Sequence, residues 1–179
     1  MLRYLIPGAV FLVLVGFFWV GLQRDPRVLP SPLIGKPAPQ FELQSVEDPA
    51  RRVSSEDFAG RVYVLNVWGT WCGGCREEHG ALLAIERQGL VPIVGLNWKD
   101  DRDLARRWLN ELGDPYVVNA FDEEGRVAID WGVYGAPETF LVDANGVVLH
   151  KHLAPITIEI WERDFVPLIE AAGAQGDPS

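Results

Sequence analysis

The two cysteines of this chain lie two residues apart, directly after the pattern of a buried strand and at the start of a helical one. Residues 61–68 are almost continuously apolar and rich in β-branched side chains, which predicts a central strand. Residues 73–88 have the helical pattern. Cys72 then lies at the amino end of a helix, where unpaired N–H groups and the helix dipole favour a thiolate. Cys75 follows one turn later and can close a ring with it.

This arrangement predicts thiol-disulfide exchange, with Cys72 as the catalytic nucleophile and Cys75 as the catalytic resolving residue. A purely structural disulfide between residues three apart would restrict the unfolded chain very little. A zinc site needs about four ligands, and only His79 is near in the sequence. We therefore expect no metal and no cofactor beyond the cysteine pair itself.

The remaining pattern predicts an α/β domain over residues 36–172, with a mixed central sheet flanked by helices. Strand–helix–strand order implies right-handed parallel crossovers. An Ala-Asn-Gly turn predicts a hairpin near the end. The expected elements are strands 91–97, 116–121, 138–143 and 147–152, a helix whose first turn holds Asp100 to Asp103, a short helix reaching Trp131, and a final helix over 156–172. Residues 173–179 should form a flexible tail.

An apolar run without any charged residue extends over residues 4–22. At about 1.5 Å per residue it would span roughly 28 Å, close to the hydrocarbon thickness of a bilayer. We expect a transmembrane anchor over residues 1–24, followed by a proline-rich linker over 25–35. The alternative is a cleaved signal peptide, which would have a shorter apolar core and a small-x-small cleavage site.

The charge of the chain bears on its partners. The formal net charge is -9, which argues against nucleic acid as a partner, since nucleic-acid-binding domains carry basic surfaces.

A proline precedes the apolar strand at 138–143. A cis Ala136–Pro137 bond that faces the cysteine pair would leave an open backbone edge for an extended peptide. The alternative is an ordinary trans proline at the start of an edge strand.

Several segments resemble known families. The segment Trp71-Cys-Gly-Gly-Cys75, with a proline before a later strand, resembles thioredoxin. Three longer segments resemble the cytochrome c maturation thiol-disulfide oxidoreductases called CcmG or DsbE, and the likeness extends over essentially the whole chain. These segments are Cys75-Arg-Glu-Glu-His79, Gly95-Leu-Asn-Trp-Lys-Asp-Asp101 and Gly132-Val-Tyr-Gly-Ala-Pro-Glu-Thr-Phe-Leu-Val-Asp143.

The resemblance implies a thioredoxin-like periplasmic domain on a single-pass bacterial inner-membrane anchor. The enzyme would reduce a direct or mixed disulfide of apocytochrome c before haem attachment. A membrane electron donor of the DsbD type would recharge it. The matching positions of the supporting groove are Trp71, Glu78, Tyr134, Ala136, Pro137 and Glu138.

The two acidic groove residues have a second interpretation as solvated surface residues. An ionised carboxylate near the cysteines would raise their pKa values and oppose the helix dipole. Asn66 stands where thioredoxin has a buried aspartate, six residues before the first cysteine. Because an amide takes up no proton, Glu138 is the expected base.

Three other functions compete with the apocytochrome assignment. A general disulfide reductant or oxidant would turn over insulin-type substrates readily. A peroxidase of the related group needs threonine three residues before the reactive cysteine, where this chain has Gly69. A non-catalytic peptide-binding module would keep its function when both cysteines are replaced by alanine.

The linker between the cysteines yields a first prediction. The family often has proline there, whereas this chain has Gly73-Gly74, and each glycine costs up to about 1 kcal/mol relative to alanine inside a helix. We expect Gly73→Pro to change the reduction potential, as measured by equilibration against a dithiothreitol series. Identical potentials in the variant and the wild type would contradict this.

Overall fold

The computed structural model describes residues 2–22 and 32–174, and the chain divides into two compact units, Met1–Pro30 and Ser31–Ser179. The first unit contains helix α1, Leu2–Leu22. Among the described residues, no helix meets the length and hydropathy required of a membrane span, so the anchor stays a prediction. The expected linker and tail fall largely on residues 23–31 and 175–179, outside the described residues.

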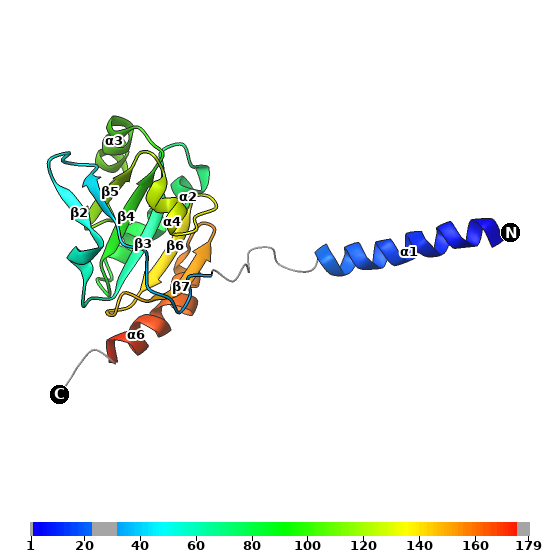
Figure 1. The fold of residues 1–179 in the computed structure, drawn as a ribbon. Helices are drawn as coiled ribbons and strands as arrows, with labels where there is room; N and C mark the ends of the chain where they lie inside the picture. Colours follow the sequence, from blue (N-terminus) through cyan, green and yellow to red (C-terminus); the bar gives the residue numbers. More distant parts are fainter. Residues whose placement is uncertain (1, 23–31, 175–179) are drawn as a thin grey trace. The chain divides into compact units, whose positions relative to one another are not determined.

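The described residues of the second unit form a seven-stranded mixed sheet with the order β2-β1-β5-β4-β3-β6-β7 (Figure 1). The β3–β4 and β4–β5 pairs are parallel, and the other pairs are antiparallel. The strands are β1 Glu42–Ser45, β2 Arg52–Ser54, β3 Tyr63–Trp68, β4 Ile93–Trp98, β5 Val118–Asp122, β6 Glu138–Val142 and β7 Val148–Leu153.

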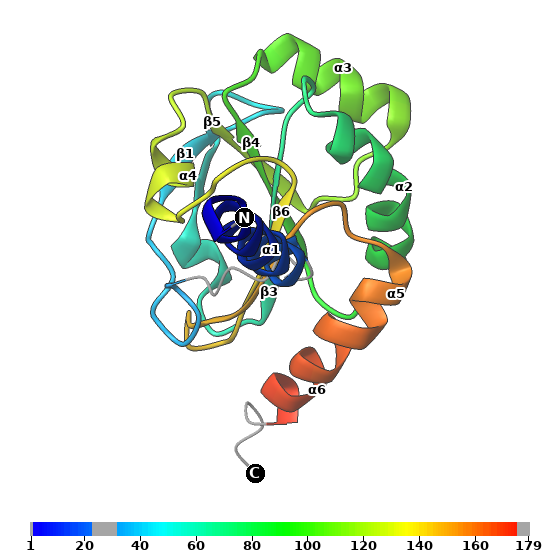
Figure 2. The same cartoon turned by 90° about the vertical axis from the view of Figure 1, so that its right-hand side faces the viewer.

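Helices cover both faces of this sheet (Figure 2). Helix α4 lies on the face opposite to α2 and α3, while the C-terminal helices lie on the α2 side. Their bounds are η1 Ser55–Phe58, α2 Gly73–Glu86, α3 Arg102–Leu112, α4 Arg126–Asp130, α5 Ile158–Ile160, the π-helical turn η2 Trp161–Phe165, and α6 Val166–Ala174. The sequence prediction of a mixed sheet flanked by helices is therefore confirmed.

The sequence pattern missed one hairpin and simplified one helix. The strands β1 and β2 pair with each other, but they hold four and three residues, too few to show a clear alternation. The final helix is interrupted by the π-helical turn Trp161–Phe165. Gly35, in the predicted linker, contacts β7, because its N–H donates to the Val148 carbonyl at 2.8 Å. The domain bounds stay a prediction.

Strand β3 is buried on both faces, which explains its nearly continuous apolar sequence. Val64 and Trp68 pack in the core beneath α2 and α3, whereas Leu65 and Val67 pack in the core on the α4 side. Since side chains alternate along a strand, Asn66 points toward α2. A polar side chain is thus placed inside the core, on the side of the sheet that α2 covers.

Candidate active site

The two cysteines form a disulfide at the junction between β3 and α2. Cys72 is the N-cap residue of α2, and its Sγ accepts a hydrogen bond from the Cys75 N–H at 3.0 Å. Both cysteines are buried in this disulfide form, with 4% and 3% of their surfaces exposed. The exposed fraction therefore does not show which cysteine is the nucleophile. The position at the amino end of the helix identifies Cys72 as the residue whose thiolate is stabilised.

The turn before Cys72 is held by the loop that follows β4. The Asp100 carboxylate accepts hydrogen bonds from the Thr70 N–H at 2.7 Å and the Thr70 hydroxyl at 2.6 Å. The Trp71 indole donates to the Trp98 carbonyl at 3.1 Å. A methyl group added to Gly69 would lie 2.6 Å from Trp71 Nε1. Glycine is therefore required at position 69 for the indole to fold back over the turn.

Pro137 packs against the turn between the two cysteines. The Ala136–Pro137 bond is cis, as predicted, so the trans alternative was wrong. A methyl group added to Gly74 would lie 2.9 Å from Pro137 Cδ, whereas one added to Gly73 would meet nothing within 4 Å. The two glycines of the linker therefore differ: Gly74 permits the close approach of Pro137, and Gly73 faces open space.

Glu78 lies one turn beyond Cys75 and is 1% exposed, so its interpretation as a solvated surface residue was wrong. Its Oε1 accepts a hydrogen bond from Asn66 Nδ2 at 2.8 Å, and its Oε2 accepts one from the Ile156 N–H at 2.8 Å. Burial raises the pKa of Glu78 to about 7, against the lowering effect of these two hydrogen bonds. The carboxyl group can thus exchange a proton near neutral pH.

Asn66 connects Glu78 to a buried polar network. Its Nδ2 also donates to the Thr139 hydroxyl at 3.0 Å, and its Oδ1 accepts from the Tyr116 hydroxyl at 2.8 Å. Burial, and then the carboxylates of Glu78 and Asp114, raise the pKa of Tyr116, which remains a proton donor. The carboxyl group with the raised pKa therefore comes from α2, and the amide on β3 donates a hydrogen bond to it.

Glu138 is also buried, so its surface interpretation was wrong as well. Its Oε2 forms an ion pair with Lys151 Nζ at 2.9 Å. Its Oε1 accepts hydrogen bonds from the N–H groups of Tyr134 and Gly135, at 2.7 and 3.2 Å. The expectation that Glu138 acts as the base is not favoured by this geometry, because a cation and two N–H donors already occupy its oxygens.

Two exposed aromatic side chains flank these buried groups. Trp71 is 53% exposed and directly precedes Cys72, and Tyr134 is 68% exposed three residues before Pro137. Ala136, also among the expected groove residues, is partly buried and packs against the core beneath α2.

Sequence reasoning did not single out Lys151 or Tyr116. For Lys151, the sequence signal was a lysine within the second strand of the predicted hairpin, residues 147–152.

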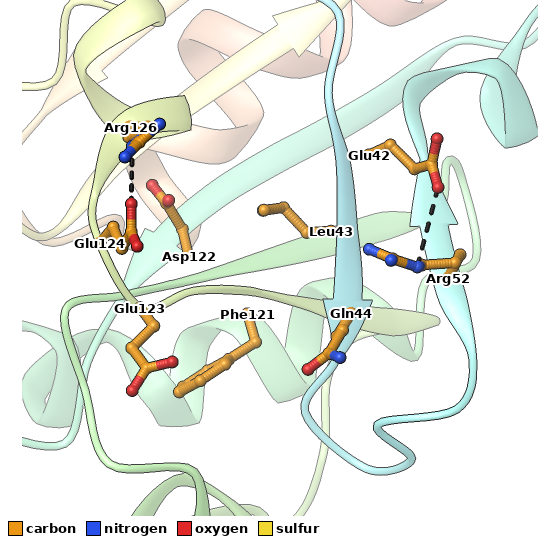
Figure 3. A pocket seen from close by; sticks show the side chains of 9 residues that line it. All are labelled: Glu42, Leu43, Gln44, Arg52, Phe121, Asp122, Glu123, Glu124 and Arg126. Carbon is orange, nitrogen blue, oxygen red and sulfur yellow. Dashed lines mark ion pairs between the residues drawn. The ribbon is translucent and has the colours of Figure 1, made fainter.

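A pocket of about 210 Å³ lies elsewhere, along β1 and the end of β5 (Figure 3). Its two arginines are each paired with a carboxylate, Arg52 with Glu42 at 3.8 Å and Arg126 with Glu124 at 2.6 Å. None of the eight expected site residues lines it. The pocket is therefore separate from the disulfide.

Comparison with known proteins agrees with this geometry. A family model described as Redoxin matches residues 33–165. The chain is 46% identical over 167 residues to the thiol:disulfide interchange protein DsbE of Allochromatium vinosum, covering 93% of this chain and 92% of that protein. It is 43% identical over 172 residues to DsbE of Escherichia coli K12, with 93% and 92% covered.

A solved structure is also similar. The crystal structure of a thiol:disulfide interchange protein DsbE from Chlorobium tepidum is 27% identical and superposes with a TM-score of 0.66. The similarity covers 78% of this chain and 96% of that one. The fold is thus thioredoxin-like, and the cysteine pair fits a redox site. The expectation that no metal or cofactor is needed stays a prediction.

The burial of Glu78 predicts how stability depends on pH. The pKa of Glu78 is about 7 in the folded chain and 4.5 ordinarily, so the folded state retains a proton that the unfolded state releases. Wild-type stability therefore falls as pH rises from 4.5 to 7. Since glutamine does not titrate, Glu78→Gln should gain up to about 3 kcal/mol of unfolding free energy relative to wild type between about pH 4 and pH 8.

The measurement is urea unfolding of the oxidised full chain in a mild detergent across that pH range. Glu77→Gln is the matched control, because Glu77 is the exposed neighbour and should show no comparable change. A constant difference between Glu78→Gln and wild type at all pH values would contradict the prediction.

Proposed function

The chain belongs to the DsbE family of thiol:disulfide interchange proteins, and on that premise we propose that it reduces a direct or mixed disulfide of apocytochrome c before haem attachment. Its enzymatic class, thiol-disulfide oxidoreductase, follows from the family. The narrower proposal is supported by the 46% and 43% identity to proteins named DsbE. The observation on the site is that Cys72 lies at the amino end of α2, with Pro137 close to Gly74 in the turn between the cysteines.

The proposed reaction proceeds in two exchange steps. The Cys72 thiolate attacks one sulfur of the substrate disulfide, so that a mixed disulfide forms and the other substrate sulfur leaves as a thiolate. The Cys75 thiolate then attacks Cys72 Sγ, which forms the Cys72–Cys75 disulfide and releases the second substrate sulfur. The substrate gains two electrons and two protons, and the cysteine pair is oxidised.

Glu78 is the proposed proton acceptor for the second step. It lies on the same helical face as Cys75, three residues further along α2. With a pKa of about 7, its carboxylate can take the proton from the Cys75 thiol, and the neutral acid can later return it. A buried negative charge also opposes the helix dipole, so protonation of Glu78 favours the Cys72 thiolate.

The exposed face around the cysteines suits an extended peptide. Trp71 and Tyr134 present large amphipathic surfaces, which are common anchors in protein recognition. The backbone before Pro137 supplies an edge to which a peptide can add as a strand. We assign substrate docking to this face, formed by Trp71, Tyr134, Ala136 and Pro137.

The proposed location is the periplasmic side of a bacterial inner membrane, with residues 1–24 as a single-pass anchor. The support comes from the uncharged apolar run over residues 4–22. A periplasmic reductant needs a continuous supply of electrons, and a DsbD-type membrane donor would provide it.

The test of the function combines a potential with a substrate comparison. The reduction potential of the full chain in detergent is measured by equilibration with a glutathione series. It should lie at or somewhat above roughly -270 mV, and well below roughly -120 mV. The reduced chain should then reduce a disulfide peptide with a Cys-x-x-Cys-His sequence faster than it reduces insulin. Cys72→Ala should abolish both reactions.

Two outcomes would change the assignment. A potential near roughly -120 mV would make the protein an oxidant. Equal rates for the peptide and for insulin would indicate the alternative function, a general disulfide reductant.

The anchor makes a separate prediction. In bacterial membranes the full chain should resist carbonate extraction, and protease added to spheroplasts should digest the catalytic domain. A lysine at the centre of a spanning helix costs about 3 kcal/mol, so Leu12→Lys combined with Val15→Lys should release the protein from the membrane. Ile34→Lys adds a lysine outside the run and should have no effect. Extraction of the wild type by carbonate would contradict the anchor.

A further inference from the structure

Lys151 is a buried cation next to the proposed docking face. It lies on β7, which is the neighbour of β6 in the sheet (Figure 1). Its partner in the register of the two strands is Phe140. Only 2% of its side chain is exposed, and its ion-pair partner Glu138 is 3% exposed. A charge buried to this extent is costly unless its partners are well placed, so its contacts need an explanation.

The Lys151 ammonium group contacts the docking loop, residues 132–137, at several points. It donates to the Gly132 carbonyl at 2.7 Å, at the beginning of the loop. It pairs with the Glu138 carboxylate at 2.9 Å, just beyond the end of the loop. It also lies 4.6 Å from the centre of the Tyr134 ring, within the range of a cation–π interaction.

Glu138 extends this restraint to the middle of the loop through its hydrogen bonds from the N–H groups of Tyr134 and Gly135. One cation and one carboxylate therefore fix both ends of the loop, two of its N–H groups and its exposed aromatic ring. The loop leads directly into Pro137, which packs against the turn between the cysteines. The ion pair thus restrains the peptide-docking segment, and neither of its charged groups contacts the sulfur atoms.

We propose that Lys151 is a positioning residue for substrate docking, which acts through Glu138 and the Gly132 carbonyl to hold the 132–137 loop and the Tyr134 ring in the form that receives a peptide. This inference rests on the docking role proposed above for that loop. A pre-ordered loop loses less conformational entropy when substrate binds. Removal of the cation should therefore weaken peptide binding and leave the chemistry of the cysteines unchanged.

The test compares two substrates of the reduced full chain in detergent. For a peptide disulfide, Lys151→Met should raise KM about tenfold, with kcat within about twofold of wild type, the pattern of a lost binding contribution. For oxidised glutathione, which is too small to extend over the loop, the rate should stay within about twofold of wild type. The reduction potential should not change.

Three further variants separate positioning from general stability. Lys36→Met is the control, because it removes an exposed lysine outside the site. Lys151→Arg keeps the charge and should restore part of the peptide affinity. Lys151→Met combined with Glu138→Gln leaves no unpaired buried charge, and it supplies the measurement if Lys151→Met alone does not fold.

Each outcome has a defined meaning. An equal loss with both substrates, or a wild-type peptide KM in the double variant, would overturn the role of Lys151. If Tyr134→Ala also leaves the peptide KM unchanged, the docking role of the loop fails as well. If Tyr134→Ala raises KM and the lysine variants do not, the docking role stands and only the inference about Lys151 fails.

Discussion

The buried carboxyl group of Glu78 joins the three segments that make the site. It belongs to α2, it accepts a hydrogen bond from Asn66 of β3, and it accepts another from the backbone of Ile156. Each partner comes from a different part of the chain, so one side chain links α2 to β3 and to the segment before α5. The cysteines at the start of that helix are positioned by the same contacts. A carboxyl group whose pKa is raised to about 7 therefore also links three segments of the chain.

Two buried carboxyl groups near the disulfide occupy contrasting surroundings. Both hydrogen bonds to Glu78 come from neutral donors, and burial raises its pKa to about 7. Glu138 has Lys151 at 2.9 Å and two backbone donors. The first environment raises the proton affinity of a carboxyl group, and the second joins a carboxylate and a cation to the loop before Pro137. The different roles proposed for these two groups of the same chemical type thus follow from their partners, neutral donors for Glu78 and a cation for Glu138.

Sequence patterns predicted the central elements well, because those elements are dominated by local signals. The apolar run of β3, the Ala-Asn-Gly turn of the β6–β7 hairpin and the helix after the cysteines are all present. The strands β1 and β2 were missed because four and three residues are too few to show a clear alternation, and β1 also pairs with β5, far along the chain. The assignment of Glu138 as the base was not supported, because its partner Lys151 is brought near by hairpin register and not by sequence proximity.

By itself, the sequence determined that a cysteine pair opens a helix after a buried strand, and that a proline precedes a later strand. These features follow from spacing and from the backbone preferences of the residues involved. Only the tertiary structure decided that Asn66 orients Glu78, that Gly74 allows Pro137 to approach, and that Lys151 holds Glu138. Those relations depend on which distant side chains become buried together. Burial then fixes the proton affinity of a carboxyl group and the partners it needs, and neither can be inferred from its position in the chain alone.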